Sequence, residues 1–182
     1  MSTTARMIKT HPAAGLRQSD ALQACIDACL ECAQTCTACA DACLAEDMVA
    51  DLRQCIRTDL DCADVCAATG AVLTRLTEPN TLIQRAVLEA CAAVCCECAQ
   101  ECERHKDMHE HCTVCAEACR RYEQACRDLL TALGWTDRSG TTTNRSLPAE
   151  VSLIHFPAAN CRAVPRAEPW RTTRRPPHAP PP

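Results

Sequence analysis

The chain has 182 residues, of which 19 are cysteine and only four are aromatic, and its formal net charge is −4. The acidity lies in residues 19–133, which hold 20 Asp or Glu against nine Lys or Arg, and this argues against nucleic acid as a partner. No apolar run is long enough to span a membrane. So few aromatic side chains supply little of the buried area on which a core normally depends.

The first expected helix contains the densest group of cysteines. It begins at Ser19 or Asp20, which are good N-cap residues, and ends near Ala45. Six cysteines between Cys25 and Cys43 follow one another at alternating gaps of four and three residues. Such residues share one face of an α-helix, within an arc of roughly 80°. The inner stripe therefore consists of thiols where leucine would normally lie.

Three further helices are expected, over residues 47–76, from Pro79 to about 105, and over 107–133. Asp107 and Glu110 have the spacing of a capping box at the start of the last one. Gly134 is a typical C-terminal stop. Four helices joined by short turns predict an all-α protein, an antiparallel up-down-up-down four-helix bundle.

The four cysteine stripes should face one another along the axis of this bundle and form a thiol-lined tube. Cys96 lies about 100° from Cys95 on the helical wheel and is expected to be peripheral. The candidate metal ligands are Cys25, Cys29, Cys32, Cys36, Cys39, Cys43, Cys55, Cys62, Cys66, Cys91, Cys95, Cys98, Cys102, Cys112, Cys115, Cys119 and Cys126.

The sequence divides into three parts. Residues 1–18 are expected to form a flexible N-terminal arm without a secretion signal, which favours a cytoplasmic protein. Residues 19–134 form the Cys-rich bundle. Residues 135–182 hold nine of the 11 prolines and read as a disordered Pro/Arg-rich C-terminal tail, in which Cys161 stands alone.

Several roles of these cysteines are weaker explanations of the pattern. As small hydrophobes, 17 thiols would bury less area than leucine or valine. Disulfides seldom form between residues three or four apart on a helix and would be reduced in a cytosol. An iron–sulfur or redox protein would gather four thiolates in an irregular loop, often before proline, and no cysteine here precedes proline.

Binding of many soft metal ions explains the stripes better. Thiolates select Cu(I) and Zn(II). Zinc requires closed tetrahedra, whereas continuous stripes suit Cu(I) bound by two or three sulfurs, with a capacity that approaches one ion per cysteine. A zinc or general soft-metal buffer stays an alternative.

The segments LECAQTCTACADAC, CAAVCCECAQECERH and HCTVCAEACRRYEQAC make residues 19–133 resemble the bacterial copper storage proteins. The resemblance implies a four-helix bundle that holds many Cu(I) ions in its core. It also implies a homo-oligomer, commonly a tetramer. Because no export signal is apparent, the chain resembles the cytosolic branch of the family. The proline-rich tail is not part of the family pattern.

A second group of residues surrounds one end of the expected tube. Met48, His105, Met108 and His109 carry copper-binding thioether or imidazole groups and should form a mouth through which ions reach Cys43. The resemblance supports this, although histidines at helix ends are also common in a polar turn. The opposite end should be closed by an apolar plug of Leu73, Leu76, Leu82, Leu129 and Leu133.

No Ser-His-Asp set, phosphate loop or pair of carboxylates in an apolar setting is apparent, so an enzyme is not expected. The expected partners are copper ions and a copper chaperone or client protein.

Overall fold

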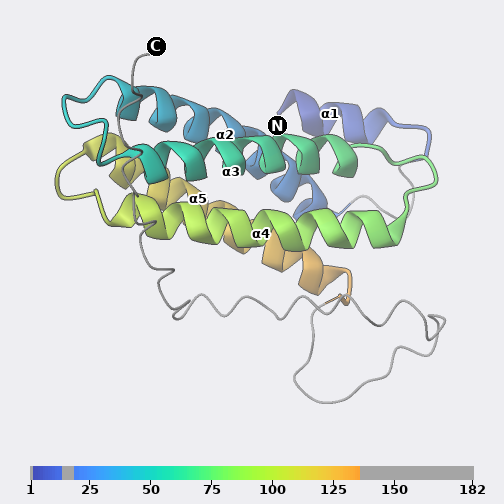
Figure 1. Ribbon diagram of the computed structural model, residues 1–182. Coiled ribbons are helices and arrows are strands. Elements are labelled where there is room, and N and C mark those ends of the chain that lie inside the picture. Colours follow the sequence, from blue (N-terminus) through green and yellow to red (C-terminus); the bar gives the residue numbers. More distant parts are fainter. Residues whose placement is uncertain (1, 14–18, 136–182) are drawn as a thin grey trace, which may run out of the picture.

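The computed structural model describes residues 2–13 and 19–135. These residues fold into five helices and contain no strand, so the expected all-α class is confirmed. Four long helices lie side by side, each packed against two others, and consecutive ones run in opposite directions (Figure 1). The helices are α1 Thr3–Thr10, α2 Asp20–Leu44, α3 Arg53–Leu73, α4 Thr81–Glu103 and α5 Glu110–Ala132. The expected tail, apart from residue 135, lies outside the described part of the chain, and so does Cys161.

Local caps determine where α2 and α4 begin and where α5 ends. The Ser19 hydroxyl accepts a hydrogen bond from the Leu22 N–H at 3.1 Å, which confirms the expected start of α2. At α4 the Asn80 side chain is the cap, rather than Pro79 opening the helix as expected, and it accepts from two backbone N–H groups. Gly134, with φ of 71°, adopts the left-handed conformation that ends α5 as expected.

The other two long helices begin later than expected. Helix α3 begins at Arg53 rather than at Asp47, because the chain before it forms successive turns with hydrogen bonds between residues three apart and is anchored by buried Leu52. Helix α5 begins at Glu110, with His109 as an N-cap that makes no side-chain cap bond. The capping box expected at Asp107 is therefore wrong.

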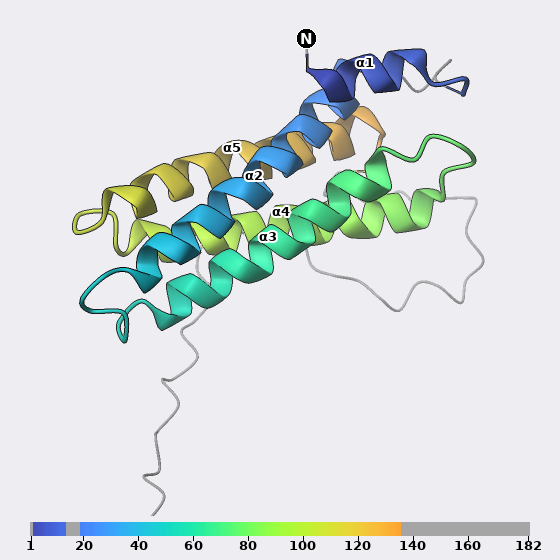
Figure 2. The same ribbon diagram turned by 90° about the horizontal axis from the view of Figure 1, so that it is seen from above.

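The short helix α1 was not expected within the N-terminal arm. Its N-cap residue Ser2 donates to the Asp27 carboxylate at 2.9 Å, and its Ala5 and Ile8 side chains are buried. It lies across the N-terminal end of α2 (Figure 2). This is the end at which the apolar plug was expected.

The plug itself is only partly as expected. Leu73, Leu76 and Leu129 are buried there, but Leu82 and Leu133 are 50% and 42% exposed. Both of the exposed leucines lie at or beyond the ends of their helices, where the neighbouring helices do not cover them. None of the helices in the described residues is long and apolar enough to cross a membrane.

Candidate metal centre

Thiols fill the space between the four long helices. Each of the 17 candidate cysteines is at most 3% exposed and is a free thiol, so the expected inward direction of the four stripes is confirmed. The gaps of three and four residues place each stripe on the buried face of its helix. Burial does not test metal binding, which stays a prediction for these residues.

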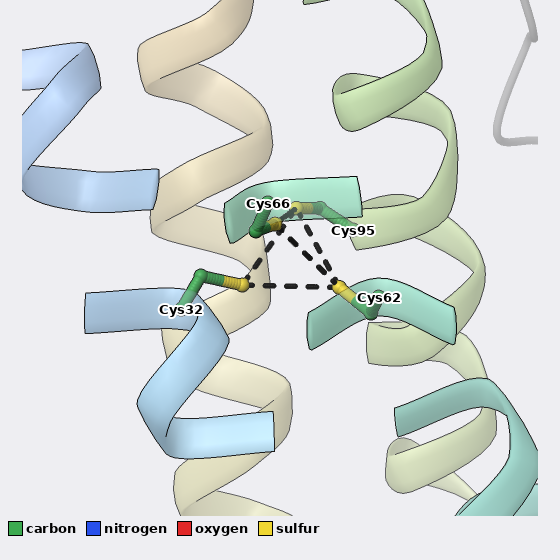
Figure 3. Close-up of side chains that lie close together, drawn as sticks. All are labelled: Cys32, Cys62, Cys66 and Cys95. Carbon is green, nitrogen blue, oxygen red and sulfur yellow. Dashed lines mark hydrogen bonds between the residues drawn. The ribbon is translucent and has the colours of Figure 1, made fainter. Parts of the chain in front are cut away.

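In the middle of the array four sulfur atoms from three helices lie close together (Figure 3). The Cys32 Sγ lies 3.8 Å from both the Cys62 Sγ and the Cys95 Sγ. The Cys66 Sγ lies 3.9 Å from Cys62 and 3.5 Å from Cys95. We call Cys32, Cys62, Cys66 and Cys95 the central quartet; their sulfur atoms all lie within 4.8 Å of one another.

Further groups of four continue toward the C-terminal end of α2. The Cys36 Sγ lies 3.5 Å from Cys119 and 3.8 Å from Cys98, and these residues form a second quartet with Cys115. Cys36 also contacts Cys32 at 3.8 Å, so the two quartets are connected. The register between the helices brings sulfurs from different stripes to the same level, so the expected continuous array also contains overlapping groups of four.

A buried carboxyl group, which the sequence analysis missed, lies beside the second quartet. Asp59 is fully buried, and its Oδ1 accepts from the thiols of Cys98, Cys102 and Cys115 at 3.0, 3.4 and 3.5 Å. Burial, and then the charge of Cys102, raises the pKa of Asp59 to about 10, so the carboxyl group is neutral at pH 7. A signal was present in the sequence, because Asp59 lies four residues after Cys55 and three before Cys62 and so occupies the vacant position of that stripe.

A histidine reaches the sulfur atoms at the mouth end. The Nδ1 of His111 lies 3.5 Å from the sulfurs of Cys39 and Cys112 and 4.0 Å from that of Cys43. Its Nε2 lies 3.2 Å from the Glu46 carboxylate, which fixes the orientation of the ring. His111 was not among the residues expected at the mouth.

The four residues predicted to surround the mouth lie in different environments. His109 stacks on His111, with ring centroids 5.4 Å apart, and its Nδ1 lies 3.0 Å from Glu46. His105 is directed to Glu101, with 3.4 Å between Nε2 and Oε1. Met48 and Met108 are 64% and 70% exposed and make no part of the buried array.

Two of the thiols nearest the mouth, those of Cys43 and Cys112, hold their protons at neutral pH. Burial, and then the charge of Cys39, raises the pKa of Cys43 to about 12. The same two causes raise the pKa of Cys112. The hydrogen bond from His111 is the main cause that lowers the pKa of the Glu46 carboxyl, so that a carboxylate faces the two imidazoles.

Cys96 lies to one side of the array. It is buried, and its Sγ accepts a hydrogen bond from the Gln100 Nε2 at 3.1 Å and lies 3.7 Å from the Arg120 Nη1. The expected direction away from the core array is consistent with these contacts, although the side chain is buried.

Comparisons with known proteins agree with a thiol-lined metal store. A family model described as "Copper storage protein" matches residues 18–131. A structure of the copper storage protein Ccsp from Streptomyces lividans, loaded with 10 copper equivalents, is 58% identical, covers 71% of this chain and 98% of its own, and has a TM-score of 0.68. A five-copper structure described as a cytosolic copper storage protein from the same organism is 64% identical over 62% of this chain and 93% of its own, with a TM-score of 0.61.

A more distant structure, the Cu(I)-bound copper storage protein BsCsp3, is 34% identical over 60% of this chain and 97% of its own, with a TM-score of 0.54. No curated protein matches the chain at a significant level. The residues that the family model matches include all 17 buried candidate thiols. The chain therefore belongs to the copper storage protein family.

Proposed function

We propose that the protein stores Cu(I) in the cytosol, bound by the thiolates of its 17 buried cysteines. The observation that carries this proposal is the continuity of the sulfur array. Sulfur contacts of 3.5–3.9 Å, mostly between different helices, run without a break from Cys29 and Cys91 through Cys66, Cys95, Cys32 and Cys36 to Cys98, Cys115 and Cys119. Two further pairs, Cys25–Cys126 at 3.9 Å and Cys55–Cys102 at 3.7 Å, lie at either end of this series. A single catalytic or structural metal site would need only four of them.

Bound copper keeps the electrical charge of the buried array close to neutral. Each Cu(I) carries one positive charge, and each thiol that loses its proton carries one negative charge. When every thiolate bridges two ions and every ion takes two thiolates, the capacity approaches one ion per cysteine, about 17 per chain. The charges then cancel inside a medium of low dielectric constant, where an uncompensated charge is costly.

Ions enter at the end formed by His111, Cys39, Cys43 and Cys112. The imidazole of His111 is the ligand most exposed to solvent in this group, with a side-chain exposure of 24%. It takes up the ion first and passes it to the thiols. Because the pKa of Cys43 is raised to about 12, each such transfer releases protons, and the affinity for copper rises with pH.

The residues around this group assist uptake from solvent. The exposed thioethers of Met48 and Met108 and the imidazoles of His105 and His109 are copper ligands of moderate strength. Further inside, the Asp59 carboxyl can take up or release a proton as its thiol neighbours bind metal, and with Cys39, Cys102 and Cys115 it offers an oxygen ligand.

The functional unit is an antiparallel up-down-up-down four-helix bundle over residues 19–134, with the flanking residues outside it. Its supports are the order of the helices and the packing of each long helix against two neighbours. The protein acts as a homo-oligomer, a tetramer by resemblance, and exchanges copper with a chaperone or client protein rather than catalysing a reaction.

An anaerobic titration of the reduced protein with Cu(I), in competition with a chromogenic Cu(I) chelator, tests the storage function. Saturation well above about ten ions per chain is expected. The variant Cys36→Ser, which removes a sulfur shared by two groups of four, should lower the capacity, whereas Thr37→Ala on the exposed face of the same helix should not. Saturation at about one to four ions per chain would contradict storage. Visible charge-transfer absorption with reversible electron uptake would support an iron–sulfur or redox protein instead.

A further inference from the structure

We propose that the central quartet, Cys32, Cys62, Cys66 and Cys95, is a closed site for one divalent ion of the Zn²⁺ class, which the copper-free protein binds before any other divalent-ion position is filled. The proposal goes beyond copper storage, because it concerns a different ion with a different coordination geometry.

Five of the six distances between the four sulfur atoms match a tetrahedral thiolate site, and the sixth, between Cys32 and Cys66, is within 4.8 Å. A zinc–sulfur bond of about 2.3 Å in a regular tetrahedron places neighbouring sulfurs about 3.8 Å apart. The Cys62–Cys95, Cys32–Cys62 and Cys32–Cys95 separations are all 3.8 Å. The Cys62–Cys66 and Cys66–Cys95 separations are 3.9 and 3.5 Å. An ion among these four sulfur atoms, which point toward one another (Figure 3), would therefore lie close to bonding distance of each of them.

The site is also closed and rigid. All four residues are fully buried, so no ligand position is left to water, as in structural rather than catalytic zinc sites. Cys62 and Cys66 lie one turn apart on α3, while Cys32 and Cys95 come from α2 and α4. The three helices hold the sulfurs in place before the ion binds, so little order has to be created on binding.

Two other groups of four are less suited to a divalent ion than the central quartet. In the second quartet the thiols of Cys98 and Cys115 donate to Asp59, and their deprotonation would cost these two hydrogen bonds. At the mouth the Cys43 Sγ is 4.0 Å from the His111 Nδ1, which is longer than a tetrahedral site requires, and the imidazole is partly exposed. The central quartet contains only sulfur and makes none of these contacts with Asp59 or His111.

Protons and charges balance as follows. Four thiols lose four protons to solvent, and the ion with four thiolates carries a net charge of −2. Thiols just outside the quartet can donate to these thiolates: Cys36 lies 3.8 Å from Cys32, and Cys91 lies 3.5 Å from Cys66. The step involves no oxidation or reduction.

Copper should displace this ion. Cu(I) is the softer ion and binds thiolates more strongly. Four thiolates with one divalent ion carry a net charge of −2, whereas four thiolates with four Cu(I) ions are neutral. The quartet would thus keep the copper-poor bundle in its folded arrangement and release the divalent ion as copper fills the array.

The test uses the full chain, reduced and free of copper, with Co²⁺ as a spectroscopic probe under anaerobic conditions. The first ion per chain should give the intense visible bands of tetrahedral cobalt with thiolate ligands, and Zn²⁺ should abolish them. Cys62→Ser should weaken this site about a hundredfold, since one of four ligands is lost. Cys25→Ser and Cys43→Ser, which remove buried thiols outside the quartet, should leave it unchanged. Addition of Cu(I) to the zinc-loaded protein should release one Zn²⁺ per chain to a chromogenic indicator.

Circular dichroism shows whether each variant keeps its helices, and Cys95→Ser on α4 gives the same test if Cys62→Ser does not. Weak, pale absorption typical of octahedral cobalt would overturn the proposal, and so would a loss of the first site in Cys43→Ser but not in Cys62→Ser. The capacity for Cu(I), measured on the same preparation, is independent. Many bound Cu(I) ions without tetrahedral Co²⁺ would refute only the divalent site, and the reverse result would refute only storage.

Discussion

Replacement of Asp59 by Asn should stabilise the copper-free protein at neutral pH and remove most of a pH dependence that we expect in the wild type. The folded protein keeps the Asp59 proton up to a pKa of about 10, whereas the unfolded chain releases it above the ordinary aspartate pKa of 3.8. A carboxyl group whose folded pKa is raised binds more protons in the folded state, so stability falls as pH rises between these two values. The slope is about 1.4 kcal/mol per pH unit, or about 3 kcal/mol between pH 5 and pH 7.

Denaturation by urea at pH 5, 6 and 7, with reductant and without copper, measures how the free energy of unfolding changes with pH. The window lies below the range in which thiols of the unfolded chain ionise, and the difference between wild type and Asp59→Asn isolates Asp59 from the histidines. Asn keeps an oxygen that can accept from the thiols of Cys98 and Cys102. Asp61→Asn is the matched control, since that carboxylate is 57% exposed and paired with Arg57. Equal slopes for the wild type and Asp59→Asn would refute the reasoning.

Three further predictions concern copper uptake and packing. His111→Ala should slow the first phase of Cu(I) uptake about tenfold, measured by stopped-flow absorption, and lower the capacity by no more than about one ion, whereas His11→Ala should change neither. Saturating Cu(I) should raise the melting temperature of the bundle by at least about 10 °C in a calorimeter, while Mg²⁺, which prefers oxygen ligands, should leave it unchanged. Gly70→Ala should be tolerated and gain up to about 1 kcal/mol in helix propensity, because a Cβ there would lie 3.4 Å from the Cys29 Cβ, at the edge of ordinary van der Waals contact. The larger side chain of Gly70→Leu should clash with α2 and lower the free energy of unfolding, which urea denaturation measures. An equal effect of both substitutions would show that α2 and α3 are not in close contact there.

The sequence predicted the helices and the inward stripes because both depend on local periodicity. Cysteines three and four residues apart must share a face of a helix, whatever the helix packs against. Ser19 and Gly134 likewise act through hydrogen bonds and backbone conformation within a few residues of themselves. The starts of α3 and α5 were less predictable, because Asp47 and Asp107 have good capping side chains but lie in turns whose course is set by buried contacts such as that of Leu52.

Family membership also followed from the sequence, through the resemblance of segments in residues 19–133 to the copper storage proteins, and the family model confirms it. What only the tertiary structure decided is which sulfur atoms meet. The register between α2, α3 and α4 determines that Cys32, Cys62, Cys66 and Cys95 lie at one level, and the course of the last turn brings His111 to Cys39. These relations join residues distant in the chain, and a shift of one helix by a single turn, about 5.4 Å, would replace every such partner while leaving each stripe unchanged.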